Sequence, residues 1–352
     1  MGINGLHKIL KKYCSDLYHT INLSEFRYQK IGIDTSLYMY KFKCILGDDW
    51  LNGFINLICS LRKNEIHPIF IYDSKAPPEK TKEQAERREQ RQKLKDKLTQ
   101  LQEEWDNYIL TGNKSTFLID MCQEENKKAP RLLSNVNVFK EDIIISKLEK
   151  LKLQTISIST EDFSLTKSLF DILKIPYHQA TTEAEATASY LCREKIVSAV
   201  LSEDTDVLAY GTPVFLSKIN THAETCVLIK LDQILNRLNL SYEGFKDLCI
   251  MCGTDYNKNI PSIGPQKAYR LIKQFQTIDG VNDNTILDVS PLNHIRTREL
   301  FTFPKDYFNK LISFCGTPDY NKLQEFLFKN NCKISPDYVE KCFNSKPLNF
   351  VD

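Results

Sequence analysis

Three short apolar runs, each leading into an acidic residue, constrain the fold of this chain most. Runs of this length that are rich in β-branched residues are typical of buried strands. A helical pattern lies between two of them, at Leu51–Leu61. This alternation predicts an α/β fold with a mostly parallel central sheet flanked by helices. The runs and their acids are residues 30–33 with Asp34, residues 67–72 with Asp73, and residues 198–203 with Asp204.

The segment between Asp73 and about Ile172 follows a different pattern. Lys80–Trp105 is polar almost throughout and rich in helix-forming residues. A helix that is polar on all sides is not part of a hydrophobic core. We therefore expect Lys80 to about Ser159 to be an insertion that stands off the sheet, with helical elements resuming at Asp162–Leu173.

The part of the chain after the sheet reads as helical. An amphipathic helix is expected at Tyr242–Cys252, followed by a Gly- and Pro-containing turn and a helix at Gln266–Phe275. The last ~45 residues are expected to be helical and packed. Their apolar residues include Tyr307, Phe308, Phe326, Leu327 and Phe328.

Composition excludes some classes of protein. The 352 residues carry a net charge of +2, so any nucleic-acid binding must depend on local patches. Eleven cysteines without regular spacing favour reduced thiols inside a cell. Cys249 and Cys252 lack a second ligand pair for zinc and are interpreted as part of a buried helix. No apolar run reaches the ~18 residues of a membrane span.

Seven carboxylates form the candidate site. In parallel sheets, ligands bind at the carboxyl ends of the strands, where several of these acids are expected to meet. Converging acids repel one another by several kcal/mol in a low-dielectric site unless cations neutralise them. Carboxylate oxygens are ligands of Mg²⁺ and Mn²⁺, and two such ions can hydrolyse a phosphodiester. The seven are Asp34, Asp73, Glu183, Glu185, Asp204, Asp206 and Asp255.

Simpler interpretations of the same acids stay open at this point. An acid after a strand is often a helix cap. Thr182 and Glu185 match the first and last positions of a capping box. Glu203, Asp204 and Asp206 could form an ordinary acidic turn.

Six short motifs follow one another along most of residues 1–275: Met1–Leu6, Ile33–Ser36, Tyr72–Pro78, Thr182–Ala186, Ser202–Asp206 and Gly253–Tyr256. They resemble, in the same order, those of eukaryotic and archaeal flap endonucleases. The chain thus resembles the flap endonuclease and xeroderma-group-G superfamily of 5′ structure-specific nucleases. This resemblance implies a PIN-like 5′ nuclease fold with an inserted helical arch and a helix–two-turn–helix.

The expected organisation is one compact catalytic domain with four parts. Residues 1–110 would form the N-terminal nuclease region with the start of the arch, and residues 111–160 the arch insertion. Residues 161–275 would form the internal nuclease region, and residues 276–352 a helical C-terminal region.

The resemblance also assigns roles to the acids and to two basic residues. Asp34, Asp73, Glu183 and Glu185 would serve mainly one Mg²⁺, and Asp204, Asp206 and Asp255 mainly the other, with Mn²⁺ as a substitute. Lys80 and Arg87 would contact the scissile phosphate. A seven-residue spacing places them on one helix face, where they could neutralise charge that develops on the phosphate. The expected catalytic set is Asp34, Asp73, Lys80, Arg87, Glu183 and Asp204.

DNA contacts are implied at both ends of the matched region. Gly2 and Tyr40 would contact the substrate, with a base stacked on Tyr40. Without the resemblance, Tyr40 would be interpreted as a core residue. Gly264, Lys267 and Arg270 of the helix–two-turn–helix would bind duplex phosphates, and the carbonyl groups of Asn259, Ile260 and Ile263 would hold K⁺. A plain helical hairpin is the alternative.

Three features depart from the family pattern. Ser262 stands where the family usually has Gly, and Gln266 stands where it has a basic residue. The segment between Asp73 and Glu183 is longer than in the cellular enzymes. No convincing sliding-clamp motif is found near the terminus, so a clamp partner is not predicted. Together with the absent basic tail, the compact length would suit a large DNA virus.

The predicted function is hydrolysis of DNA phosphodiesters at 5′ flaps or 5′ ends by two-metal-ion catalysis, in replication, repair or recombination. The expected partner is branched or flapped DNA, and the protein is expected to be an intracellular monomer in the nucleus or a viral replication compartment. Alternatives are a 5′–3′ exonuclease, a junction resolvase, an RNA-cutting nuclease with a similar sheet, and a non-catalytic nucleic-acid-binding relative.

Overall fold

The computed structural model describes residues 2–126, 139–302 and 312–344. The chain divides into two compact units. The first consists of Met1–Lys80 with Ile158–Asp352, and the second of Thr81–Ser157. The predicted four-part division therefore stays a prediction, while the second unit occupies the range in which an insertion is expected.

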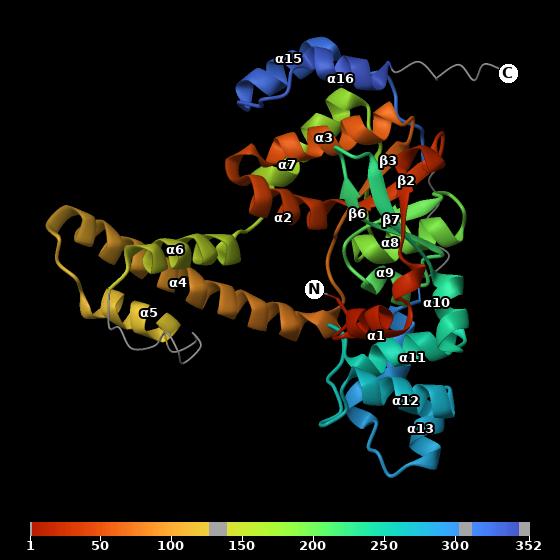
Figure 1. The fold of residues 1–352 in the computed structure, drawn as a ribbon. Helices are drawn as coiled ribbons and strands as arrows, with labels where there is room; N and C mark the ends of the chain where they lie inside the picture. The colour runs from red at the N-terminus through yellow and green to blue at the C-terminus, as the bar shows by residue number, and fades with distance from the viewer. Residues whose placement is uncertain (1, 127–138, 303–311, 345–352) are drawn as a thin grey trace. The chain divides into compact units, whose positions relative to one another are not determined.

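A seven-stranded sheet forms the centre of the first unit, in the order β1-β7-β6-β5-β2-β3-β4 (Figure 1). The pairs from β6 to β4 are parallel, whereas β7 is antiparallel to both β6 and β1. The strands are β1 (His19–Asn22), β2 (Lys30–Asp34), β3 (His67–Tyr72), β4 (Tyr177–Gln179), β5 (Ala199–Leu201), β6 (Val214–Asn220) and β7 (Thr225–Lys230).

Helices cover both faces of this sheet, because alternate residues of its central strands point to opposite sides. Ile69 and Ile71 of β3 pack in one hydrophobic cluster, and Phe70 and Tyr72 pack in the other. The first cluster is completed by α1 (Leu6–Tyr13), α8 (Ala184–Arg193), α9 (Asp206–Ala209), α10 (Leu231–Leu238), α11 (Tyr242–Cys252), α12 (Pro265–Phe275) and α13 (Ile278–Asn284). The second is completed by α2 (Thr35–Leu46), α3 (Trp50–Lys63), α7 (Thr160–Leu173), α15 (Tyr320–Lys329) and α16 (Pro336–Phe343).

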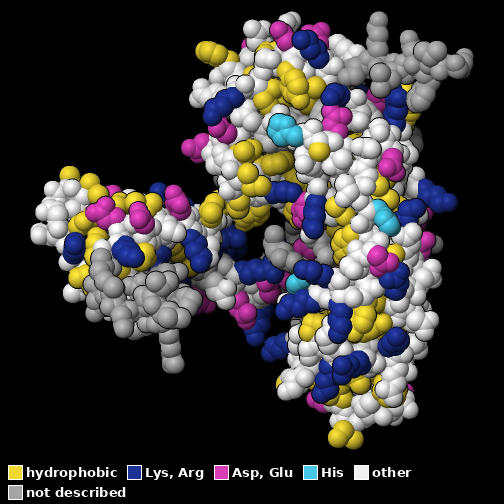
Figure 2. All heavy atoms as spheres, in the orientation of Figure 1, with side chains coloured by type: hydrophobic (Ala, Val, Ile, Leu, Met, Phe, Trp, Pro, Cys, Tyr) yellow, Lys and Arg dark blue, Asp and Glu magenta, His cyan; other side chains and the backbone are white. Residues whose placement is uncertain are grey.

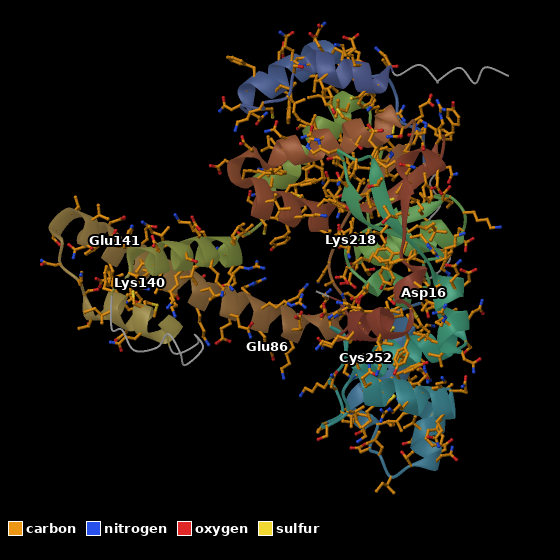
Figure 3. All side chains as sticks on the ribbon, in the orientation of Figure 1. Asp16, Glu86, Lys140, Glu141, Lys218 and Cys252 are labelled. Atoms are coloured by element: carbon orange, nitrogen blue, oxygen red, sulfur yellow. The ribbon has the colours of Figure 1, made fainter. Side chains whose placement is uncertain are left out.

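The strands at the three acid-ended runs and the helix at Tyr242–Cys252 are confirmed. Cys249 and Cys252 are buried in α11, as interpreted; Figure 3 labels Cys252. The antiparallel edge formed by β1, β6 and β7 was not predicted.

The prediction that the apolar residues near the C-terminus are packed is only partly right. Phe326 and Leu327 are buried in α15, but Phe328 is 87% exposed. Leu323, Phe326 and Leu327 share one helix face at i, i+3 and i+4, and Phe328 falls on the opposite face. Tyr307 and Phe308 lie outside the described residues.

The second unit contains α4 (Thr81–Thr111), α5 (Thr116–Asn126) and α6 (Glu141–Thr155) around a core of its own. The expectation that the first helix is polar on all sides is wrong for its C-terminal half. There Leu101 is fully buried against Leu118 and Ile144, whereas residues 81–100 include no buried side chain. The Tyr108 hydroxyl donates to the Glu141 carboxylate at 2.6 Å. Glu141, at the start of α6, is labelled in Figure 3.

Among the described residues, no helix has the length and apolar character needed to span a membrane.

Candidate functional site

The carboxyl ends of β3, β2 and β5, which are neighbours in the sheet, bring acidic residues to one edge. Asp34 ends β2, and its Oδ1 accepts the Leu37 N–H at 3.1 Å at the start of α2. Asp73 follows β3, and its Oδ1 accepts the Ala184 N–H at 2.9 Å at the start of α8. Both acids are thus bonded to helix N-termini, yet each also faces other carboxylates.

The capping-box interpretation of Thr182 and Glu185 is wrong. Helix α8 begins at Ala184, with Glu183 at its N-cap position and no hydrogen bond from that side chain to the helix. The Asp73 carboxylate, from a distant part of the chain, binds the first helical N–H instead. Glu183 and Glu185 are therefore available to the site.

The acidic-turn interpretation of the segment after β5 is wrong for Asp204 and Asp206, which are buried, whereas Glu203 is partly exposed and pairs with Lys41. Asp204 is 7% exposed and Asp206 is 9% exposed. The Asp206 N–H donates to Asp204 Oδ1 at 3.1 Å. The buried Asp206 Oδ1 has no hydrogen-bond partner among the described residues.

Gly2 packs directly against these two acids. A Cβ atom at this position would lie 2.2 Å from Asp204 Oδ1 and 3.3 Å from Asp206 Oδ1. Its φ of +97° is also a conformation that side chains disfavour. Residue 2 must therefore be Gly for the start of the chain to lie on the acidic edge.

The acids lie close enough to change one another's ionisation. Burial, with the neighbouring Asp73 and Asp204 carboxylates, raises the pKa of Asp34 well above its ordinary value. Burial also raises the pKa of Glu185, Asp204 and Asp206, with contributions from the neighbouring acids, which include Glu183 and Asp255. All seven predicted acids therefore contribute to a single anionic pocket.

Lys80 is the cation that faces this pocket. It ends the short 3₁₀ turn η4 (Pro78–Lys80), and its Nζ lies 2.5 Å from Glu183 Oε1 and 3.1 Å from Asp255 Oδ2. Burial disfavours its charged form, but the adjacent carboxylates outweigh burial and raise its pKa. The lysine therefore stays protonated and neutralises part of the acidic charge.

Two tyrosines that were not predicted complete the surroundings of Glu183. The Tyr256 and Tyr210 hydroxyls both donate to Glu183 Oε2, the latter at 3.0 Å, and their oxygens lie 2.5 Å apart. The adjacency of Tyr256 to Asp255 is a sequence signal for one of them. Tyr210 has no such signal, because the fold alone brings it to Glu183.

The chemistry of the pocket fits hard divalent cations. Its available ligands are carboxylate oxygens, the donors that Mg²⁺ and Mn²⁺ prefer, and Asp206 offers a buried oxygen with no other partner. As they stand, no three His, Cys, Asp or Glu residues in the described ranges are arranged to hold a metal ion. Lys80 occupies the position between Glu183 and Asp255 and must move before both can become ligands.

Two more of the predicted residues lie on α4 and α2. Arg87 belongs to the second unit and pairs there with Glu83 of its own helix. Tyr40 is half-buried in α2. The roles assigned to both stay predictions.

The predicted helix–two-turn–helix comprises α11, the turn and α12. The Asn259 side chain donates to the Cys252 carbonyl at 2.9 Å, and the Ile260 carbonyl accepts the Ile263 N–H at 3.1 Å. Gly264 caps α12, and a Cβ added to it would meet no atom within 4 Å. Lys267 and Arg270 are exposed on α12.

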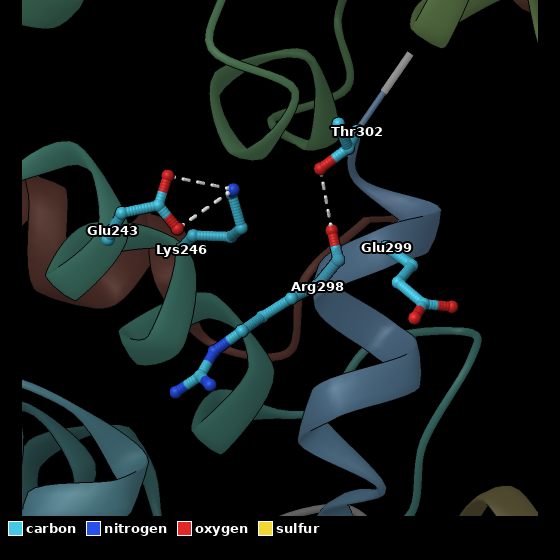
Figure 4. A pocket seen from close by; sticks show the side chains of 5 residues that line it. All are labelled: Glu243, Lys246, Arg298, Glu299 and Thr302. Atoms are coloured by element: carbon cyan, nitrogen blue, oxygen red, sulfur yellow. Dashed lines mark hydrogen bonds and ion pairs between the residues drawn. The ribbon is translucent and has the colours of Figure 1, made fainter. Parts of the chain in front are cut away.

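A separate pocket between α11 and α14 (His294–Leu300) contains none of the predicted site residues (Figure 4). Its buried Lys246 pairs with Glu243 at 3.0 Å. Arg298 pairs with the buried Asp247 at 2.6 Å and with Asp279 at 2.7 Å. These paired charges connect α11, α13 and α14.

Comparisons with known proteins agree with this arrangement. The XPG N-terminal domain matches residues 1–94, and the XPG I-region matches residues 174–255. A probable RAD2-like endonuclease of Invertebrate iridescent virus 3 is 35% identical over 333 residues, covering 87% of this chain and 86% of that protein. Flap endonuclease 1 of Cryptosporidium muris is 28% identical over 364 residues, covering 94% of this chain and 69% of that protein.

Solved structures confirm the predicted fold. The catalytic core of Rad2 in complex with DNA substrate matches with a TM-score of 0.68 at 16% identity, covering 97% of this chain and 98% of that one. Flap endonuclease-1 from Methanococcus jannaschii matches with a TM-score of 0.61 at 24% identity, covering 94% and 97%. Taken with the family matches, these likenesses make the chain a member of the XPG and RAD2-like endonuclease family of structure-specific 5′ nucleases.

Proposed function

We propose that this nuclease hydrolyses DNA phosphodiesters at 5′ flaps, with its seven carboxylates holding two Mg²⁺ ions. The observation that carries the proposal is the single anionic pocket at the carboxyl ends of three adjacent parallel strands. A pocket that raises the pKa of its own acids gains from any bound cation. When bound, two such ions supply an activated water and neutralise charge on the leaving oxygen.

The residues of the chain have separate tasks in this proposal. Asp34, Asp73, Glu183 and Glu185 serve mainly one ion, and Asp204, Asp206 and Asp255 the other. Lys80 leaves Glu183 and Asp255 and takes the scissile phosphate as its new anionic partner. Arg87 is the second cation assigned to that phosphate. Both cations then offset the negative charge that increases as the bond breaks.

Substrate binding is assigned to surfaces outside the pocket. The backbone at Gly264 and the side chains of Lys267 and Arg270 bind duplex phosphates, because a helix N-terminus without a side chain lets a phosphate approach closely. The carbonyls of Asn259, Ile260 and Ile263 hold K⁺ there. A base stacks on Tyr40, and Gly2 keeps the start of the chain close to the cut. The protein acts as an intracellular monomer, in the nucleus or a viral replication compartment.

The Asp204→Asn variant tests the metal-binding carboxylates. Removing one ligand charge should reduce the rate of cutting of a labelled 5′ flap in Mg²⁺ by about a hundredfold or more. Substituting a residue that only orients a metal ligand typically reduces metal affinity or activity by about 10–100-fold. Asp283→Asn, an exposed acid in α13, is the matched control and should cut normally. Undiminished cutting by Asp204→Asn contradicts the proposal. Product lengths on flapped, nicked and four-way substrates separate flap cutting from exonuclease and junction-resolving activity.

A further inference from the structure

Helix α1 presents a cationic face that the site described above does not use. Lys8, Lys11 and Lys12 are exposed and lie at i, i+3 and i+4, so they share one side of the helix. The opposite side, with Leu6, Ile9 and Leu10, is buried in the core. Because α1 contains no Asp or Glu, its own sequence does not neutralise these charges.

Direct contacts fix α1 against α12. Gln266 Oε1 accepts hydrogen bonds from Lys12 Nζ at 3.3 Å and from the Tyr13 hydroxyl at 3.0 Å. The rings of Tyr13 and Tyr269 lie 4.8 Å apart between centroids. The ammonium group of Lys12 is therefore held beside position 266, where the resemblance leads one to expect a basic residue.

The exposed side of α12 is cationic as well. Lys267, Arg270 and Lys273 are exposed at intervals of three residues, and this helix also contains no Asp or Glu. Figure 2 shows Lys and Arg side chains gathered over the region that α1 and α12 occupy in Figure 1. The packed helices α1 and α12 thus carry six exposed Lys and Arg side chains in the first unit.

We propose that α1 and α12 form one continuous phosphate-binding surface for duplex DNA, in which Lys12 supplies the charge that Gln266 lacks. The inference rests on the proposed binding of duplex by α12. An acidic protein partner is the less favoured ligand, because protein interfaces have an apolar centre, whereas the exposed face of α1 consists of His7 and three lysines. Separate cations on rigid helices suit the regularly spaced charges of a duplex.

The test replaces Lys8, Lys11 and Lys12 by Gln in the full chain and measures binding to a blunt duplex without divalent cations, over a series of salt concentrations. The plot of log affinity against log salt has a slope of about 0.9 for each phosphate neutralised. The slope is expected to fall by about two to three, with weaker binding at low salt. The matched control, Lys174, Lys322 and Lys329 to Gln, removes equal exposed charge elsewhere in the first unit and should bind as the parent does.

A second variant, Lys267→Gln with Arg270→Gln, separates the two possible failures. If it weakens duplex binding while the α1 variant keeps the parent's affinity and slope, the role of α1 is overturned and the proposed duplex surface on α12 stands. If neither variant changes binding, both ideas are overturned. Because the replaced α1 side chains are exposed, the thermal unfolding of the variant should equal that of the parent. An unchanged unfolding temperature then excludes loss of fold as the cause of weaker binding.

Discussion

At the scale of single residues, Glu183 shows how a buried carboxylate is kept in one orientation. One of its oxygens accepts from Tyr210 and Tyr256, and the other faces the Lys80 ammonium. Because both hydroxyls donate to Glu183, the two tyrosines are assigned a positioning role for that carboxylate. Residues that orient metal ligands in this way commonly change metal affinity or activity by about 10–100-fold.

The variant Tyr256→Phe tests that positioning role. It removes one hydroxyl and keeps the ring, which packs on Phe301. The Mg²⁺ concentration for half-maximal cutting is expected to rise by about 10–100-fold. The control is Tyr320→Phe in α15, whose hydroxyl is buried without a partner in the described part of the chain. A metal requirement equal to the parent's, with normal folding, contradicts the role assigned to Tyr256.

The sequence predicted the seven acids and Lys80 as site residues, whereas it did not predict Tyr210, Tyr256 or the bond from Ala184 to Asp73. Asp34 ends β2 and Asp73 directly follows β3, and the ends of these strands could be predicted because the apolar runs stop there. The contact between Tyr210 and Glu183 joins residues 27 positions apart and depends on how α8 and α9 pack. The bond from the Ala184 N–H to Asp73 also depends on tertiary structure. It stands in place of the capping box that the local sequence suggested for the start of α8.

At the scale of elements, the turn before α12 combines a departure in sequence with a demanding backbone conformation. Ser262 has a φ of +64°, in the left-handed region where Gly is favoured. This backbone conformation explains why the family usually has Gly at this position. In this chain Ser262 adopts it at a cost in backbone strain. The strands of the antiparallel edge were not predicted, because β1, β6 and β7 are not directly followed by an acid, although β7 contains the apolar run Cys226–Ile229.

Replacement of Ser262 by Gly is expected to stabilise the protein. A left-handed residue with a Cβ costs about 1–2 kcal/mol, and the greater freedom of Gly in the unfolded chain offsets part of that gain. The free energy of unfolding should rise by about 0.5–1 kcal/mol, measured from denaturant midpoints. Ser262→Ala keeps the Cβ and should give no gain. A less stable Gly variant would show that the Ser side chain itself stabilises the turn.

At the scale of the whole molecule, the two units have separate hydrophobic cores. The first is organised around the sheet, and the second around Leu101, Leu118 and Ile144. The sequence indicated an insertion because polarity changes sharply after residue 80. It did not indicate an independent core there, because the apolar residues of α4 that pack in this core begin only at Leu94 and their partners lie in two other helices.

Separate cores predict separate unfolding events. Leu101→Ala removes a fully buried side chain from the second unit and should cost that unit about 2–5 kcal/mol. Hydrogen exchange should then accelerate in α4, α5 and α6, while protection in β2, β3 and β5 stays at the parent's level, since parts of a protein with separate cores can open independently. Ile55→Ala, which empties a fully buried position in α3, should produce the reciprocal pattern. Equal loss of protection in both units from either substitution would show that they unfold as one cooperative body and would contradict the assignment of separate cores.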